Sequence, residues 1–218
     1  MQNNANLIEY ANQFGYNLDY LSSGSPIFQL PSHYTFSSDS IALAHFVKEK
    51  EIETLVDLCA GSGVVGLELV DTKNVGALYM VEIQQDLSQM SARSAKFNTK
   101  KTKIVAINKS LVGSFKELPS SDVVVVNPPY FKVGSGDVPQ NLSRACARHE
   151  ISVTLSEIIL EASLILKPNG KFYMVHIKSR QNEIEKLLLK HNFKLLSTKV
   201  LSGKLERILV EAVKQKTY

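Results

Sequence analysis

The sequence predicts an α/β fold: a doubly wound, mostly parallel sheet of seven strands with an antiparallel hairpin at its C-terminal end. Short runs rich in β-branched residues alternate with longer runs of helical periodicity, a rhythm typical of parallel βαβ units. The run 122–126 is apolar at four successive positions, as expected of a central parallel strand buried on both faces. The last two apolar runs are joined only by a turn at Ser202 and Gly203, so they should pair antiparallel.

The predicted elements follow one another in a regular order from residue 54 onward. The predicted strands are 54–58, 77–81, 103–107, 122–126, 171–177, 193–201 and 207–213. The predicted helices are 63–70, 84–98, 155–166 and 179–191. A loop is expected over 127–152, and the Lys-Pro-Asn-Gly segment at 167–170 predicts a turn that stops the third of these helices.

The first 40 residues differ from the rest in composition. Aromatic residues recur there, and Gly24 to Pro26 indicate a turn. Ser38 or Asp39 is suited to cap a short helix that runs to Val47. We expect one domain over 1–218, in which 1–40 form an N-terminal extension packed on the core at the C-terminal edge of the sheet.

Composition and charge narrow the class of protein. A chain of 218 residues with 44% hydrophobic and 21% charged residues is typical of one globular domain. Two distant cysteines, Cys59 and Cys146, form neither a disulfide framework nor a zinc pattern, so we expect a reducing cytoplasm and no metal. No signal peptide and no membrane span is predicted, and the expected oligomeric state is a monomer by default.

The basic residues are distributed unevenly. Residues 1–47 contain no Lys or Arg and three acids, so the rest of the chain carries 25 basic against 18 acidic residues, a net charge of +7. Such an excess suits a polyanionic partner. One helix face allows either a phosphate-facing stripe or a solvated surface, through Lys178, Arg180, Lys186 and Lys190.

A glycine motif follows the first predicted strand. Gly61, Gly63 and Gly66 have the spacing G-x-G-x-x-G, and Glu82 closes the second strand about 20 residues later. The glycines permit a tight turn close to a ligand, and the acid accepts hydrogen bonds from ribose hydroxyls. Nicotinamide enzymes and methyltransferases share this motif. Asp57 favours the methyltransferases, because its carboxylate attracts the ammonium of a methionine moiety and would repel a pyrophosphate.

A second motif, Asn127-Pro128-Pro129-Tyr130, follows the fourth predicted strand. An aromatic amine is a poor nucleophile because its lone pair is delocalised into the ring. The Asn127 side-chain oxygen and the Pro128 carbonyl are suited to accept its two hydrogens and to orient its nitrogen toward a sulfonium methyl. Proline fixes the backbone and offers no competing N–H. Tyr130 is suited to stack on an extruded base.

These motifs resemble the Rossmann-like methyltransferases that use S-adenosyl-L-methionine to modify exocyclic nitrogens. More closely, the chain resembles the bacterial tRNA-valine adenine-N6 methyltransferases. The resemblance rests on the two motifs and on several further segments, which are 36–40, 81–84, 127–131, 147–150, 166–168, 175–176 and 208–211. It implies methylation of an adenosine N6 in tRNA, near the anticodon.

The resemblance also assigns residues to roles. It implies a catalytic group made of Asn127, Pro128, Pro129 and Tyr130. The implied cofactor-binding residues are Phe36, Ser38, Asp57, Cys59, Ala60, Gly61, Gly63, Glu82, Ile83, Ser110 and Asn127. Substrate or RNA contact, or ordering of the active-site loop, is implied for Phe131, Arg148, His149 and Glu150. Cys59 and Ser110 depart from the family, which usually has a glycine and an aspartate at these two positions.

Three alternatives remain open at this point. The same chemistry serves a guanine N2 amine, a DNA adenine or a protein glutamine amide. A nicotinamide oxidoreductase agrees with the glycines but gives no reason for Asn127 to Tyr130. A non-catalytic RNA-binding protein with a decayed pocket has Cys59 and Ser110 as its hints.

Overall fold

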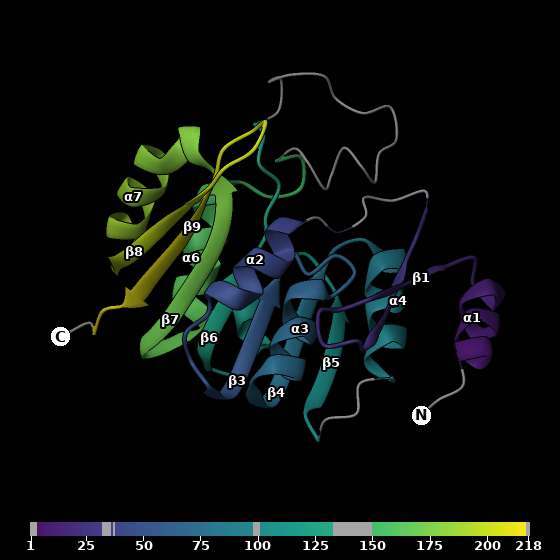
Figure 1. Cartoon of the computed structure of the whole chain (residues 1–218). Coiled ribbons are helices and arrows are strands. Elements are labelled where there is room, and N and C mark those ends of the chain that lie inside the picture. Colours follow the sequence, from purple (N-terminus) through teal and green to yellow (C-terminus); the bar gives the residue numbers. More distant parts are fainter. Residues whose placement is uncertain (1–3, 32–35, 37, 98–100, 133–149, 217–218) are drawn as a thin grey trace.

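The computed structural model describes residues 4–31, 36, 38–97, 101–132 and 150–216. Its main feature is a seven-stranded sheet with the strand order β5-β4-β3-β6-β7-β9-β8 (Figure 1). The strands of this sheet are β3 (Glu51–Leu58), β4 (Asn74–Glu82), β5 (Lys103–Asn108), β6 (Ser121–Val126), β7 (Leu166–Ile177), β8 (Phe193–Leu201) and β9 (Arg207–Lys214). β3 to β7 pair in parallel, whereas β9 pairs antiparallel with β7 and with β8. The predicted fold class is confirmed.

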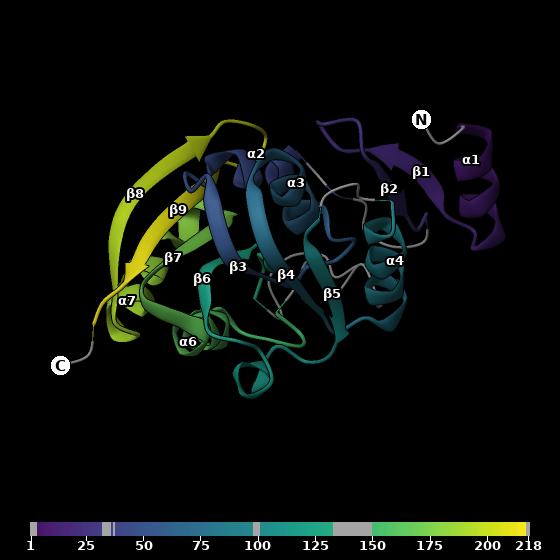
Figure 2. The ribbon, with the colours of Figure 1, turned by 90° about the horizontal axis from the view of Figure 1, so that it is seen from below.

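Helices cover both faces of the sheet (Figure 2). On one face lie α2 (Ser38–Phe46), α3 (Val64–Thr72) and α4 (Gln85–Ala95). On the other face lie α6 (Leu155–Ile165) and α7 (Gln181–Lys190). Two short 3-10 helices, η1 (Ser114–Lys116) and η2 (Lys178–Arg180), precede β6 and follow β7 in the chain. No helix among the described residues is long and apolar enough to cross a membrane.

The side chains of β3 illustrate why the sheet needs both layers. Successive side chains of a strand point to opposite faces. Leu55 belongs to the core on the α2–α3 side, while Val56 and Leu58 belong to the core on the α6–α7 side. β6 is buried along its last four residues, as predicted for a central strand.

The register brings three strand ends to the same level. Leu58 pairs with Val81 of β4 and with Val126 of β6, so the next residues along these strands are Cys59, Glu82 and Asn127. The chain runs outward from β3 to β4 and β5 and then returns to β6 on the other side of β3. A doubly wound sheet binds its ligands at such a reversal of strand order.

The predicted turn at 167–170 is wrong in one respect. These residues belong to β7, which begins directly after α6 at Leu166. The pairing steps from Ser121 opposite Leu166 to Val123 opposite Lys171, so the segment forms a bulge within the strand. Asn169 has a φ of 66°, a value found in turns, but Leu166 and Lys171 on either side of the segment stay paired with β6.

The N-terminal residues form structure that the sequence did not predict. α1 (Asn4–Gln13) precedes an antiparallel pair, β1 (Asn17–Tyr20) and β2 (Pro26–Gln29). Their aromatic side chains pack on α4, where Tyr16 and Phe28 join Leu87 and Met90. The hairpin therefore packs mainly on α4, and its last residue, Gln29, reaches Ser62 after the C-terminal end of β3. α2 packs on α3, β7 and β9.

Candidate active site

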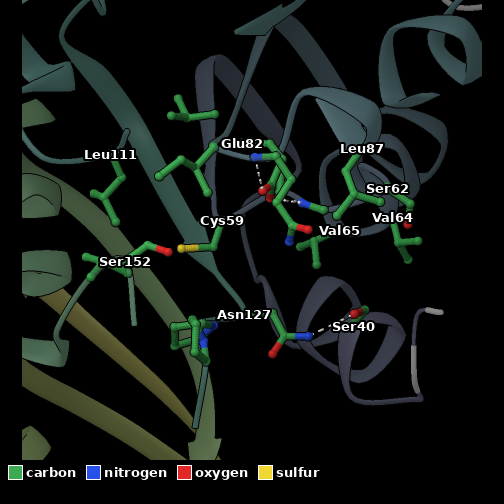
Figure 3. Close-up of a pocket in the computed structure, with 18 of the residues that line it drawn as sticks. Ser40, Cys59, Ser62, Val64, Val65, Glu82, Leu87, Leu111, Asn127 and Ser152 are labelled. Atoms are coloured by element: carbon green, nitrogen blue, oxygen red, sulfur yellow. Dashed lines mark hydrogen bonds between the residues drawn. The ribbon is translucent and has the colours of Figure 1, made fainter. Parts of the chain in front are cut away.

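A cavity of about 430 Å³ opens at the C-terminal ends of β3, β4 and β6 (Figure 3). Its volume is in the range usual for small-molecule and cofactor sites. Both sequence motifs contribute to it. Of the residues predicted for the site, those that line the cavity are Phe36, Cys59, Ala60, Gly61, Glu82, Ile83, Ser110, Asn127, Pro128, Pro129, Tyr130 and Phe131.

The glycine turn between β3 and α3 places backbone at the cavity wall. Cys59, Gly61 and Gly63 have φ values of 54°, 55° and 83°, in the left-handed region. A Cβ at Gly61 would meet no protein atom within 4 Å, so the space above this glycine is left to a ligand. A Cβ at Gly63 would lie 2.8 Å from Met80 Sδ, which shows that this glycine serves the packing of α3. Gly63 does not line the cavity.

Glu82 is held in place by backbone donors. Its Oε2 accepts from the Gly61 N–H and its Oε1 from the Gln84 N–H, each at 2.8 Å (Figure 3). Burial raises the pKa of the Glu82 carboxyl, although these N–H groups lower it. The carboxylate links the glycine turn to the end of β4, and a second lone pair on each oxygen remains for ribose hydroxyls.

Asp57 lies beneath the glycine turn and does not line the cavity. Its side chain points to the α3 side of the sheet, where Oδ2 accepts from the Gly66 N–H at 2.9 Å. Oδ1 is buried and has no hydrogen-bond partner among the described residues. Burial, with the charge of Glu82 as a further cause, raises the pKa of Asp57 to about 7. A cationic ligand above the turn would supply a counter-charge that none of the described residues provides, so the site fits the methionine end of S-adenosyl-L-methionine.

The amide of Asn127 is fixed at both of its ends. Nδ2 donates to Ser40 Oγ of α2 at 2.9 Å, and Oδ1 accepts from the Tyr130 hydroxyl at 2.8 Å (Figure 3 shows the first of these). Asn127 lines the same cavity as Gly61 and Glu82.

The side chain of Arg180 fixes the loop after Asn127. Arg180 donates to the carbonyl oxygen of Tyr130 and forms ion pairs with Glu150 and Glu183. Arg180 is only 9% exposed, so it belongs neither to a phosphate-facing stripe nor to a solvated helix face, the two alternatives that the sequence left open. Glu150 also pairs through its backbone N–H with the carbonyl of Phe131. Its position favours the ordering of the loop over contact with RNA.

His176 supports the ring of Tyr130 from β7. The two ring centroids are 5.3 Å apart. Burial lowers the pKa of His176 to about 3, and Nδ1 accepts from the Ile177 N–H, so the imidazole stays neutral. This contact with a neutral imidazole would hold the Tyr130 ring in a position to stack on a nucleobase.

Some predicted residues lie elsewhere. Ser38 is exposed and does not line the cavity, whereas Ser40 does, because positions two apart on a helix differ by about 200° in direction. Both Ser38 and Asp39 are helical residues of α2, and Asp39 turns to Tyr130 and Arg207. Arg148 and His149 lie outside the described residues. Ser110 lines the cavity, and its Oγ accepts from the Val112 N–H.

Several functional candidates were missed from the sequence. Gln29 is 3% exposed and connects Ser62 of the glycine turn with the backbone N–H of Phe36. Arg207 reaches the cavity from the start of β9. Asp39 and Ser40 belong to the recognised segment 36–40, and Arg207 stands directly before the segment 208–211, so these residues had a usable signal. Gln29 lies in no recognised segment.

The chain is similar to known methyltransferases. The tRNA1(Val) (adenine(37)-N6)-methyltransferase of Shewanella halifaxensis is 23% identical over 172 residues, which are 78% of this chain and 68% of the relative. The release factor glutamine methyltransferase of Bifidobacterium longum is 30% identical over 139 residues, 56% of this chain and 47% of the relative. The crystal structure of the M. jannaschii tRNA m1G37 methyltransferase superposes with a TM-score of 0.66 at 14% identity, covering 93% of this chain and 57% of that one.

A family model also matches this chain. The model of the methyltransferase small domain matches residues 31–204, which include the glycine turn, Glu82 and the Asn127 to Tyr130 motif. Because this match covers well over half of the chain, the protein belongs to the methyltransferase small domain family, and S-adenosyl-L-methionine is its cofactor.

Proposed function

We propose that the protein methylates the exocyclic N6 of an adenosine in RNA, with tRNA as the acceptor. The observation that carries the proposal is the position of Asn127. Its amide opens into the cavity that the glycine turn and Glu82 also line, at the level of the ends of β3 and β4. A neutral acceptor next to the cofactor site is what an unreactive amine requires.

The work of the protein residues is to position. S-adenosyl-L-methionine supplies a methyl group on a positively charged sulfur. Asn127 Oδ1 and the Pro128 carbonyl accept the two hydrogens of the amine and direct its lone pair to that methyl. The Tyr130 ring, supported by His176, lies against the base. The conjugate acid of the product loses its proton readily, so no strong base is required at Asn127.

Two further observations favour RNA. The relative from Shewanella halifaxensis is named for adenine N6 in tRNA. In addition, residues 48–218 carry the net charge of +7, which suits a polyanion. The family match leaves the nicotinamide alternative without support.

A second acceptor deserves the same test. The Bifidobacterium longum relative is named for a release factor glutamine, whose side-chain amide offers the same two hydrogens to Asn127. The experiment is therefore transfer of a labelled methyl group to tRNA, mRNA-like RNA, duplex DNA and release factor, followed by mass spectrometry of nucleosides and amino acids. We expect N6-methyladenosine from tRNA. Label recovered only as N5-methylglutamine, or only in another base, would refute the proposal.

Asn127→Ala provides the internal test of the assigned role. The variant loses an acceptor used in the transition state, so kcat should fall by about 10²-fold or more, as for other lost orienting donors or acceptors. The Kd for S-adenosyl-L-methionine should change by less than about threefold, since Asn127 is assigned to the amine. Titration calorimetry and initial rates measure the two quantities. An equal loss of binding and turnover would contradict the role.

A further inference from the structure

A polar network behind Asn127 joins three distant parts of the chain. Ser40 and Asp39 come from α2, Asn127 and Tyr130 from the loop after β6, and Arg207 from the start of β9. Asp39 is 4% exposed, and its Oδ2 lies 2.9 Å from Arg207 Nε in an ion pair. The same Oδ2 lies 3.3 Å from the Tyr130 hydroxyl. A buried carboxylate is thus held by a cation at the rim of the proposed amine site.

The Tyr130 hydroxyl has one hydrogen and, among the residues that the structure describes, two side-chain oxygens close enough to accept it. Asn127 Oδ1 is at 2.8 Å and Asp39 Oδ2 at 3.3 Å, so the two oxygens share the hydrogen and Asn127 is favoured in this state. Asn127 Oδ1 is also the atom proposed to accept from the amine. An amine that arrives there competes with the tyrosine hydroxyl for this oxygen.

Without a second acceptor, displacement of the hydroxyl would cost free energy. A buried donor left without a partner costs about as much as a lost hydrogen bond. Asp39 removes this cost, because rotation about the tyrosine C–O bond redirects the hydrogen to a carboxylate. A hydrogen bond to an ionised acceptor is stronger than one to an amide. Ser40 meanwhile holds Nδ2, so the amide keeps its orientation while its oxygen changes partner.

We propose that Asp39, held by Arg207, accepts the Tyr130 hydroxyl hydrogen when the acceptor amine binds Asn127, and that Ser40 fixes the amide during this exchange. Asp39, Ser40 and Arg207 are then positioning residues that act through Asn127 and Tyr130. The inference rests on the proposed function, since it assigns Asn127 Oδ1 to the amine.

The kinetic test is a double-mutant cycle of Asp39→Leu and Tyr130→Phe. Asp39→Leu removes the second acceptor at nearly constant shape, and kcat should fall by about tenfold. The KM for S-adenosyl-L-methionine should stay within about twofold. In the Tyr130→Phe background, where there is no hydroxyl to accommodate, Asp39→Leu should change kcat by less than about twofold. Asp39→Asn, which keeps an acceptor oxygen, should restore part of the loss.

The matched control is Asp19→Asn, at an exposed carboxylate of β1 that accepts from the Tyr20 N–H. It should leave kcat unchanged. Thermal melting of every variant separates a folding defect from the kinetic effect. Equal losses from Asp39→Leu in both backgrounds would overturn the proposal, because Asp39 would then act independently of the tyrosine hydroxyl.

An acceptor-free measurement keeps the two proposals separate. The side-chain amide signals of Asn127 are assigned by NMR through their loss in Asn127→Ala. Asp39→Leu removes Asp39 from the shared hydrogen bond, so it should shift these signals in the protein that retains Tyr130 and leave them in place in Tyr130→Phe. A shift of the same size in both would overturn the inference. If no acceptor is methylated at all, the proposed function fails, while this spectroscopic result still decides the coupling.

Discussion

At the scale of the residue, Asp57 is a buried carboxyl group to which no described residue supplies a counter-charge. Its pKa is raised from 3.8 to about 7 by burial and by the charge of Glu82. Between these pH values the folded protein holds a proton that the unfolded chain has lost. The stabilisation that this provides is complete below about pH 4 and is lost as the pH rises to about 7.

The free energy of unfolding of the Asp57→Asn variant, relative to that of the unmodified protein, should therefore increase as the pH rises. The variant keeps an acceptor for the Gly66 N–H but cannot ionise. Relative to the unmodified protein, its free energy of unfolding should gain about 2 kcal/mol between about pH 5 and about pH 8. Urea unfolding at both pH values measures this. The affinity for the cationic cofactor should fall in the same variant. If the unfolding free energies of the variant and of the unmodified protein changed in parallel with pH, the raised pKa of Asp57 would be contradicted.

At the scale of the element, the turn between β3 and α3 divides its glycines between two tasks. Gly61→Ala places a methyl group in open space at the cavity wall, at a φ of 55°. Unfolding free energy should fall by about 1 kcal/mol from backbone strain. The affinity for S-adenosyl-L-methionine should fall by about tenfold or more, because the methyl group takes space from the ligand.

Gly63→Ala is the matched comparison in the same turn. Its Cβ would collide with Met80 Sδ and crowd Ser91 Cβ, at 2.8 and 3.1 Å. We expect a loss of unfolding free energy of about 2 kcal/mol or more, from strain and overpacking together. Chemical unfolding and titration calorimetry on both variants separate the tasks. The division would be wrong if Gly61→Ala were the less stable variant of the two.

The loop after β6 is held by the contacts of Arg180 with the Tyr130 carbonyl and with Glu150, which we call the Arg180 clamp. Its ion pair with Glu150 is buried on both sides, with side chains 9% and 7% exposed. Arg180→Met leaves a buried carboxylate and should lower the unfolding free energy by about 3 kcal/mol. Lys178→Met is the control, because its pair with Glu206 is exposed and should contribute less than about 1 kcal/mol. Similar losses in both variants, measured by urea unfolding, would show that the clamp is unimportant.

At the scale of the whole molecule, the charge distribution predicts how RNA binding responds to salt. The basic excess lies entirely in residues 48–218. If phosphates contact these residues, tRNA affinity should fall roughly tenfold or more between about 50 and 200 mM salt. Affinity for the cofactor, whose contacts are buried, should change little. Filter binding and calorimetry across this range measure the two affinities, and salt-independent tRNA binding would refute a phosphate interface.

The sequence by itself determined the seven-stranded sheet and about half of the residues that line the cavity. The alternation of strands and helices follows from local periodicity, and the seven-stranded sheet with its antiparallel end was predicted from it. The glycine turn, Glu82 and the Asn127 motif were predictable because each stands directly after a strand. Parallel strands bring such positions to one edge.

The tertiary structure decided which side chains reach the site from elsewhere and which turn away. Asp57 lies beneath the turn because strand alternation directs it to α3, and Ser40 takes the place expected for Ser38 because of its angle on the helix. Gln29 comes from a strand that carries no recognised segment, and Arg207 reaches Asp39 only through the position of β9 in the sheet. A pattern along the chain records local conformation, whereas contacts between residues nearly 170 positions apart, such as Asp39 and Arg207, exist only once the chain has folded.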